Sequence, residues 1–412
     1  MITAMMSIQE AMDTLVKAGR GFQNNEEILP LQECLGRFLA QNILCKKPLP
    51  AFDNSAMDGY AACVQDEGKR VRIIHSVFAG DCEEREIRSG ECVKIMTGAK
   101  MPKNANCVIP FEEIEGGLGA QGDIVLPKTL KEGANIRKMG EEAHLDSKLL
   151  SRGEALDEYH LTLLASQGIA YTKVFESLKI NVLSGGNELK EPWESSHSYQ
   201  TYNSNTTMIL ATLKSFGFCG SYGGVLPDKK EILTQALQKP YDVILTTGGA
   251  SRGEADWMRV VLQECGAQML IDGIKIKPGK PTMVARLGEK FIVALPGNPL
   301  AAAVLLRLLI LPFLRQISGA SKYHPQYLLL KNCDSFKLKS RMNAMLGDIT
   351  SNGFYLTQKG KYNSGEILPL LKSNALAIFD EQSTEIPLGR EIKVLPYQML
   401  WSEEKSDIIN HL

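Results

Sequence analysis

The chain has 412 residues, of which 44% are hydrophobic and 23% charged, and its formal net charge at pH 7 is −1. This is the composition of a folded protein with a full core, and at about 150 residues per domain the length predicts roughly three domains. Duplex nucleic acid requires a concentrated basic surface, so a sequence without a long run of Lys or Arg argues against that partner.

Cysteines and apolar segments exclude three further classes of protein. The nine cysteines include no Cys-x-x-Cys pair, which argues against a disulfide framework or a zinc knuckle. Residues 1–19 lack the basic flank and apolar run of a signal peptide, so we expect a cytoplasmic location. The most apolar segment, 300–317, is interrupted by Arg307 and Pro312 and is therefore predicted to be a buried helix and not a membrane span.

The N-terminal half contains helical and strand-like stretches in turn. Residues 7–19 read as an N-capped amphipathic helix that ends at Gly. A second helical stretch, LQECLGRFLAQNI, follows at 31–43, and the prolines of KKPLPAFD then mark a boundary. From 51 to 140, short strand-like runs alternate with Gly-rich turns, which predicts a small β-rich domain. Residues 154–170 return to a helical pattern.

From 178 to 318 the chain alternates short apolar runs with helical segments. The strand-like runs are LKINVLSGG, GSYGGVL, YDVILTTGG and KFIVALPGN. Such alternation is typical of βαβ units, so we predict a doubly wound α/β domain with a parallel sheet covered on both faces. The tail from 325 shows short strands between turns, which predicts a small C-terminal β-barrel or sandwich. The expected fold class is therefore multidomain, α/β plus β.

Three predicted strands of the α/β domain end in Gly-rich turns, at 184–189, 246–256 and 295–302. Ligands of open parallel sheets bind beyond the carboxyl ends of the strands, where loops meet helix N-termini. Glycines at that edge expose backbone N–H groups to an anion. The pattern therefore favours an anion or nucleotide site there.

Charged residues lie close to these turns in the sequence. Lys277 and Lys280 stand in KPGKP, where the prolines make a rigid cationic corner; an ordinary turn with solvated lysines is the alternative. Glu188, Asp228 and Asp256 each lie near the same sheet edge, and a helix cap or a solvated acid is the alternative for each. Carboxylates that converge on a phosphate repel it unless a divalent cation lies between them. The combination indicates Mg²⁺-assisted phosphate chemistry.

Seven motifs occur in the order found in the molybdopterin molybdenumtransferase family, which also includes the E domain of gephyrin. The motifs are FDNSAMDGYA, IMTGAKMP, NIRKMGEE, GGNEL, TGGASRGEAD, IKPGKP and LPGNP. The resemblance covers essentially the whole chain. It implies a homodimer whose active sites combine the α/β domain of one subunit with the DNSAMDGY domain of the other. It also implies adenylylated molybdopterin and molybdate as substrates, with Mg²⁺-dependent hydrolysis of the adenylate and release of AMP.

The resemblance completes the division into domains and assigns roles to residues. The expected parts are an N-terminal helix that packs on the α/β domain (1–26), a helical linker and dimerisation domain (27–50 and 141–177), a β-rich domain (51–140), the molybdopterin-binding α/β domain (178–318) and a C-terminal β-barrel (325–412). The implied catalytic residues are Asp58, Glu188, Asp228 and Asp256, with Glu188 and Asp256 as preferred metal ligands. The implied substrate-binding residues are Thr97, Gly248, Gly249, Ser251, Lys277, Lys280, Pro296, Gly297 and Asn298.

Within the DNSAMDGY motif, Ala56 and Met57 are expected to anchor a turn that directs Asp58 into the partner's pocket, with a simple turn as the alternative. The chain departs from the family pattern at Gly185, Glu142 and Ala301, where Thr, Asp and Ser are usual. Two other functions remain open, a molybdopterin adenylyltransferase and a non-catalytic dimeric scaffold. No nucleic-acid or membrane partner is expected.

Overall fold

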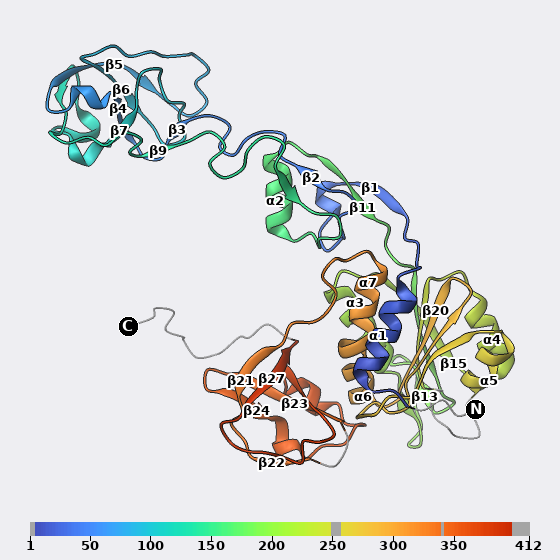
Figure 1. Cartoon of the computed structure of the whole chain (residues 1–412). Helices are drawn as coiled ribbons and strands as arrows, with labels where there is room; N and C mark the ends of the chain where they lie inside the picture. Colours follow the sequence, from blue (N-terminus) through green and yellow to red (C-terminus); the bar gives the residue numbers. More distant parts are fainter. Residues whose placement is uncertain (1–4, 249–256, 339–341, 398–412) are drawn as a thin grey trace. The chain divides into compact units, whose positions relative to one another are not determined.

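The computed structural model describes residues 5–248, 257–338 and 342–397. Contacts divide the chain into two compact units (Figure 1). The first unit comprises Met1–Ala40, Gly153–Thr162 and Ala170–Leu412, and the second comprises Gln41–Arg152 and Leu163–Ile169. The bounds of the five domains expected from the sequence stay predictions.

The second unit is built around a five-stranded sheet, as the alternation of strand-like runs and Gly-rich turns over 51–140 predicts. Its strand order is β7-β4-β6-β5-β8. The strands are β4 (Gly59–Ala62), β5 (Arg70–Val77), β6 (Glu91–Ile95), β7 (Cys107–Pro110) and β8 (Asp123–Val125). Two short ribbons accompany the sheet, β3 (Asn54–Ser55) with β9 (Ile136–Arg137) and β2 (Ile43–Leu44) with β10 (Lys148–Leu150). Fully buried Tyr60 packs edge-on against Phe111 in its core.

The prediction of a helix over 31–43 is wrong. A single 3₁₀ turn, Leu31–Glu33, follows strand β1 (Glu26–Pro30), which pairs with β11 (Tyr171–Phe175). Gly36 has a φ of 76°, which a continuing right-handed helix does not allow. The amides of Leu39 and Ala40 then donate to the carbonyls of Glu154 and Lys173, both at 2.9 Å, so nonlocal bonds replace helical ones. The helix predicted for 154–170 is present as α2 (Glu158–Ser166).

The α/β part contains a six-stranded sheet of order β15-β12-β16-β20-β19-β17. Its strands are β12 (Ile180–Gly185), β15 (Gly220–Leu226), β16 (Val243–Thr247), β17 (Gln268–Asp272), β19 (Met283–Leu287) and β20 (Lys290–Leu295). The four runs predicted from the sequence are the four parallel strands. β19 and β17 continue the sheet in antiparallel fashion, which the sequence pattern did not predict.

Alternating side chains bury both faces of this sheet. Val243 and Leu245 of β16 belong to the cluster with helices α1 (Ile8–Gly19), α3 (Asn205–Ser215), α6 (Pro299–Leu305) and α7 (Leu311–Ile317), whereas Ile244 packs with α4 (Lys230–Gln238) and α5 (Trp257–Glu264). Figure 1 shows the two helix layers on opposite sides of the sheet. This period-two alternation confirms the predicted doubly wound arrangement, because successive residues of a strand point to opposite faces.

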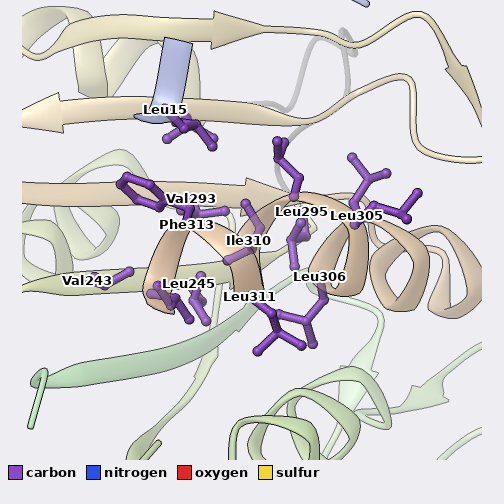
Figure 2. Close-up of a cluster of buried hydrophobic side chains, with 14 of the residues drawn as sticks. Leu15, Val243, Leu245, Val293, Leu295, Leu305, Leu306, Ile310, Leu311 and Phe313 are labelled. Carbon is purple, nitrogen blue, oxygen red and sulfur yellow. The ribbon is translucent and has the colours of Figure 1, made fainter. Parts of the chain in front are cut away.

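The apolar segment 299–317 is the buried helix that the sequence predicts. It is long and apolar enough to cross a membrane, but 83% of it is buried inside the first unit. Leu305, Leu306, Ile310 and Phe313 lie among side chains of β16 and β20, together with Leu15 of α1 (Figure 2). A π-helical turn, Leu306–Ile310, separates α6 from α7. Pro312 lacks the N–H that a regular helix requires, and such a wide turn accommodates that loss.

The C-terminal part is a β structure joined directly to the α/β part. Its main sheet has the order β18-β23-β25-β27-β21, and β24 pairs with β23. The strands are β21 (Leu328–Lys331), β23 (Met342–Thr350), β24 (Gly353–Leu356), β25 (Ala375–Phe379) and β27 (Glu391–Pro396), and β22 (Phe336–Lys337) pairs separately with β26 (Glu385–Ile386). β18 (Ile276–Lys277) comes from the KPGKP region and pairs with β23. The closed barrel stays a prediction.

Candidate functional site

The three Gly-rich turns meet at one edge of the α/β sheet. The register places Ser184 beside Thr247 and Thr247 beside Leu295, so β12, β16 and β20 end at the same level. Gly248 has a φ of 80°, and a Cβ there would lie 2.2 Å from the carbonyl oxygen of Gly185. A Cβ at Gly297 would lie 3.6 Å from the Cα of Gly248. The turns therefore touch through their backbones. Gly249, Ser251 and Asp256 lie outside the described residues.

We expect Gly248→Ala to lower the free energy of unfolding and to weaken anion binding at this edge. The methyl group would overlap the Gly185 carbonyl and would also demand a left-handed backbone. Gly266→Ala is the matched control, because Gly266 has a φ of 71° and no atom within 4 Å of its Cβ position. The control should cost only the backbone strain of about 1–2 kcal/mol. Equal urea-denaturation midpoints for the two variants would contradict the predicted close approach.

A polar network that runs from buried Ser184 and Thr247 to exposed Tyr222 supports this edge. The hydroxyls of Ser184 and Thr247 are 2.9 Å apart, and Ser184 donates to Asn203 Oδ1 at 2.8 Å. Asn203 Nδ2 donates to the Tyr222 hydroxyl at 3.1 Å, and Tyr222 donates to Glu191. Burial, followed by the hydrogen bond to Glu191, raises the pKa of Tyr222 to about 12. Tyr222 is therefore a neutral donor that fixes the strand ends.

Two of the predicted acids stand at the same edge. Asp228 is not a helix cap, because α4 begins at Lys230 and Lys229 occupies the N-cap position. Instead, Asn187 N donates to Asp228 Oδ2 at 3.4 Å, and Asp228 N donates to Asn187 Oδ1 at 3.2 Å. This reciprocal pair ties the GGNEL turn to the turn after β15. Asp228 also lines a cavity of 40 Å³ with Gly185 and Gly248.

Glu188 lies on the surface of the GGNEL turn. Its Oε2 is 2.6 Å from the position that a Cβ on Gly186 would occupy, and Gly186 has a φ of 146°. Only Gly at 186 therefore lets the carboxylate fold back over the turn. Within the described part of the chain neither Glu188 nor Asp228 forms an ion pair. Their carboxylate oxygens are thus available to a ligand.

Two carboxylates at this edge are of the chemical type that binds Mg²⁺. Carboxylate oxygens are hard ligands, and Mg²⁺ in proteins is usually held by one or two carboxylates together with waters and substrate phosphates. Over residues 5–248, 257–338 and 342–397, no group of three His, Cys, Asp or Glu side chains forms a metal cage. Glu188 and Asp228 supply two carboxylates, whereas Asp256, the other expected ligand, lies outside the described residues.

The KPGKP segment is a fixed corner. The amides of Ile274 and Thr282 both donate to the carbonyl oxygen of Lys280 at 3.0 Å, and Thr282 Oγ1 donates to Gly279 O at 2.9 Å. Gly279 has a φ of 125°, and a Cβ there would lie 2.8 Å from Leu305. The backbone is therefore held from both sides, while the side chains of Lys277 and Lys280 are exposed. This favours the rigid-corner interpretation over a loose turn.

Both lysines line a pocket of 480 Å³ between the α/β part and the C-terminal part. A third lysine, Lys337, also lines it, and no carboxylate does so among the described residues. The C-terminal part contributes Asn343, Tyr362, Asn363 and Ser364 to its wall. We call this cavity the lysine pocket. Its charge suits a small oxyanion, because three cations face it without a neutralising acid.

The LPGNP turn joins the lysine pocket to the glycine edge. Pro296 and Asn298 line the pocket, whereas Gly297 is the residue that approaches Gly248. Asn205 Nδ2 donates to the Gly297 carbonyl at 2.7 Å, and Asn298 Nδ2 donates to Ser364 Oγ at 2.8 Å. The turn is therefore held by one side chain from α3 and one from the C-terminal part.

The family departure at Ala301 falls inside the lysine pocket. Ala301 is 2% exposed and contributes to the wall. A Ser at this position would add a hydroxyl there, whereas Ala adds none. The Ser364 hydroxyl lines the same pocket, and sequence patterns assigned no role to it, to Lys337 or to Asn343. These residues meet the KPGKP segment because β18 pairs in parallel with β23. This pairing joins segments that lie far apart in the sequence.

The remaining two predicted residues, Asp58 and Thr97, form a pair in the second unit. Thr97 N and Thr97 Oγ1 both donate to Asp58 Oδ1 at 2.7 Å. The backbone N–H and then the hydroxyl lower the pKa of Asp58 below its ordinary value. Both side chains are exposed on the surface of the unit. Asp58 is therefore an ionised carboxylate that is held in a fixed direction on the surface of the unit.

The expected anchor of this turn needs correction. Met57 is 41% exposed, so it does not anchor the turn. The hydroxyl of fully buried Ser55 donates to Met57 O and accepts from Met57 N, and fully buried Tyr60 follows directly. A Cβ at Gly59 would lie 2.1 Å from the carbonyl oxygen of Ile109, so only Gly fits between these points. Polar bonds and a close backbone approach hold the turn, not apolar burial.

We expect Thr97→Val to raise the pKa of Asp58 part of the way to the ordinary value of about 3.9. The variant removes the hydroxyl bond but keeps the backbone N–H. Because the native pKa is depressed, the ionised form is favoured down to low pH, and the variant should protonate at higher pH than the wild type. A carboxyl ¹³C titration by NMR measures this, with Thr97→Ser as the control that keeps the hydroxyl. Identical titrations of all three proteins would contradict the assigned bond.

Comparisons with known proteins cover nearly the whole chain. Two family profiles match, described as MoeA N-terminal region (domain I and II) over residues 6–168 and as probable molybdopterin binding domain over residues 181–316. The chain is 30% identical over 411 residues to the molybdopterin molybdenumtransferase of Haemophilus influenzae, which covers 96% of this chain and 100% of that protein. It is 26% identical to a protein of the same name from Staphylococcus epidermidis, over 95% of each.

Solved structures show the same likeness. The crystal structure of the molybdopterin biosynthesis moeA protein from Pyrococcus horikoshii OT3 matches with a TM-score of 0.81 at 26% identity. The match covers 96% of this chain and 100% of that one. The likeness therefore includes the residues of the glycine edge, the lysine pocket and the second unit.

Proposed function

Because the chain belongs to the molybdopterin molybdenumtransferase family, we propose that it hydrolyses adenylylated molybdopterin as it inserts molybdenum from molybdate and releases AMP. The enzyme is a transferase whose reaction is molybdenum insertion in the biosynthesis of the molybdenum cofactor. The observation that supports the finer steps is that the LPGNP turn links the glycine edge to the lysine pocket. Gly297 of this turn approaches Gly248 at the glycine edge, which carries two carboxylates, and Pro296 and Asn298 line the pocket with three lysines.

The glycine edge is proposed to hold the phosphates of the adenylate. Gly185, Gly248 and Gly297 leave the backbone bare, and the turns stand at the carboxyl ends of parallel strands. Backbone N–H groups aimed at phosphate oxygens stabilise the charge that develops as the phosphoanhydride bond breaks. Water attacks one phosphorus atom of the phosphoanhydride, the bridging oxygen leaves with the other phosphate, and the products are AMP and molybdopterin with its own phosphate.

Glu188, Asp228 and Asp256 are proposed as the acidic residues of this step, and Glu188 and Asp256 are the residues that would hold Mg²⁺. When bound, Mg²⁺ supplies Lewis-acid polarisation of the phosphoanhydride and an activated water. The carboxylates themselves orient the attacking water and accept its proton. Asn187 keeps Asp228 in place through the reciprocal pair at 3.2 and 3.4 Å.

The lysine pocket is proposed as the binding site of molybdate. Molybdate is a compact dianion, and the lining residues Lys277, Lys280 and Lys337 offer point charges with rotatable donors. Ser364 and Asn298 add neutral donors next to them. The shared LPGNP turn would place the oxyanion next to the pterin that receives molybdenum.

We expect Lys280→Gln to weaken molybdate binding about tenfold, because one charge-assisted hydrogen bond is lost. Lys275→Gln is the matched control, since Lys275 is exposed on the same segment but does not line the pocket. Equilibrium dialysis with metal analysis, at two salt concentrations, measures both affinities. The same loss in the two variants would mean that net charge, and not the pocket, governs binding.

The whole reaction is tested by incubating the protein with purified molybdopterin adenylate, Mg²⁺ and molybdate. AMP and protein-bound molybdenum should rise together, and chelation of Mg²⁺ should stop both. ATP and molybdopterin alone should give no adenylate, which separates this function from an adenylyltransferase. A protein that binds partners yet never releases AMP would instead be a scaffold.

Subunit organisation and location complete the proposal. The Asp58–Thr97 pair is exposed and its carboxylate is held in one direction, which supports a homodimer in which it completes the partner subunit's site. The cytoplasmic location expected from the sequence belongs to the same proposal, and no nucleic acid or membrane is a partner.

A further inference from the structure

A second cationic cavity lies at the other end of the long buried helix. It has a volume of 340 Å³, and its wall includes Arg307, Arg315, Lys322, His324, Tyr323 and Tyr397. We call it the arginine pocket. Arg315 is sixteen residues beyond Pro299, or roughly 24 Å along the helix axis, so this cavity is separate from the LPGNP turn.

The two arginines are partly buried without an acidic partner. The guanidinium of Arg307 lies 4.6 Å from the ring centroid of Tyr397, and that of Arg315 lies 5.1 Å from the ring of Phe38. Arg315 also donates to the carbonyl oxygen of Lys322, at 3.0 Å from Nη2. Neither arginine forms an ion pair over residues 5–248, 257–338 and 342–397.

Burial of these two guanidinium charges costs free energy in the protein without a ligand. Burial lowers the pKa of Arg307 and of Arg315, which reports the cost of removing their charge from water. Buried charges in proteins are normally paired, because desolvation is otherwise uncompensated. Lys322 adds further positive charge at the exposed rim, where the His324 side chain also lies. A bound anion would supply the missing compensation.

The shape and lining of the pocket narrow the class of anion. Its volume lies within the range of roughly 300–1,000 Å³ that small-molecule sites occupy. Phe216, Tyr323 and Tyr397 give it aromatic surface, and Leu311 and Leu395 give it apolar surface. Guanidinium groups bind phosphate through paired hydrogen bonds, and aromatic walls favour a planar ring. A bare inorganic ion would leave most of this cavity unfilled.

We propose that the arginine pocket binds an aromatic phosphate monoester of about the size of a nucleoside monophosphate. Arg307 and Arg315 would hold the phosphate, with Lys322 at the rim, and the rings would hold the planar group. The proposal does not depend on the reaction at the glycine edge.

The test uses the full-length protein and calorimetric titration with AMP, adenosine and inorganic phosphate. AMP should bind at least tenfold more tightly than either fragment, because each fragment lacks one half of the contacts. Arg307→Met should weaken AMP binding at least tenfold and should leave the Tm without ligand unchanged or higher, since an uncompensated charge is removed. A merely structural arginine would instead lower the Tm on replacement.

Three further variants locate the binding. Arg286→Met is the matched control, because Arg286 also lies over a phenyl ring, that of Phe291 at 5.9 Å, but outside the pocket; AMP binding should persist. Lys322→Gln, at an exposed position, should weaken binding without any risk to folding. Lys280→Gln should leave this site intact. Absence of saturable AMP binding, equal affinity in wild type and Arg307→Met, or loss only in Lys280→Gln would overturn the proposal.

Discussion

Replacement of Glu188 by Gln is expected to reduce Mg²⁺-dependent AMP release by about a hundredfold or more, the usual consequence of losing one preorganised group at a reacting phosphate. Gln keeps the size of the side chain and removes its charge. Glu188 has no ion pair within the described residues and lies over Gly186, so the substitution disturbs no structural bond there. Binding of the pterin adenylate should persist, because the backbone of the Gly-rich turns is unchanged.

The measurement is a Mg²⁺ titration of single-turnover AMP formation. The variant should need more Mg²⁺ and should remain slow at saturation. Glu191→Gln is the control, because Glu191 is three residues away and accepts from Tyr222, a bond that the Gln oxygen can still accept, so the variant should spare the Mg²⁺ dependence. If Glu188→Gln lost pterin binding but released AMP normally, Glu188 would be a substrate-binding residue and not an acid of the reaction.

The α/β sheet was the part of the fold most open to prediction, and the reason lies in its burial. β12, β16 and β20 are buried on both faces, so each reads as a continuous apolar run followed by a Gly-rich turn. The parallel register then brings Gly185, Gly248 and Gly297 together without further information. The glycine edge was therefore predictable from local sequence and the rules of parallel sheets.

The lysine pocket was only half predictable. Lys277 and Lys280 stand out in their motif, whereas Lys337 and Ser364 face them because β18 pairs with β23, which begins sixty-five residues beyond Lys277. No local period encodes such a contact. The wrong helix at 31–43 has a similar cause, since the amides of Leu39 and Ala40 bond to residues more than 110 positions away. Tertiary bonds overrode a local helical pattern.

The turn at Asp58 shows that sequence patterns do not reveal every interaction that holds a turn. Because Ala56 and Met57 are apolar, we predicted that they hold the turn. Instead, Ser55 holds it through hydrogen bonds and Gly59 through a close backbone approach. Polar anchors carry no periodic signal. Because buried groups hold the turn, the Asp58 carboxylate can remain exposed at the surface.

Replacement of Asp58 by Asn is expected to leave folding and dimerisation intact and to reduce molybdenum insertion strongly. Asn Oδ1 still accepts from Thr97, so the turn should keep its geometry, while the negative charge is lost. Mass determination in solution and the thermal unfolding midpoint check the first expectation, and protein-bound molybdenum checks the second. Unchanged turnover would remove Asp58 from the site.

The stronger experiment pairs this variant with Glu188→Gln in one dimer. Carrying a different affinity tag on each variant allows the mixed dimer to be purified. If Asp58 completes the partner subunit's site, one of the two sites in that dimer contains both native residues and the other contains neither, so roughly half the wild-type rate should return. If each site is built within one protomer, both sites carry one lesion and the mixed dimer stays as inactive as its parents. A mixture of wild type with the doubly substituted chain gives the opposite arrangement and serves as the control, since its mixed dimer recovers activity only when the site lies within a single protomer.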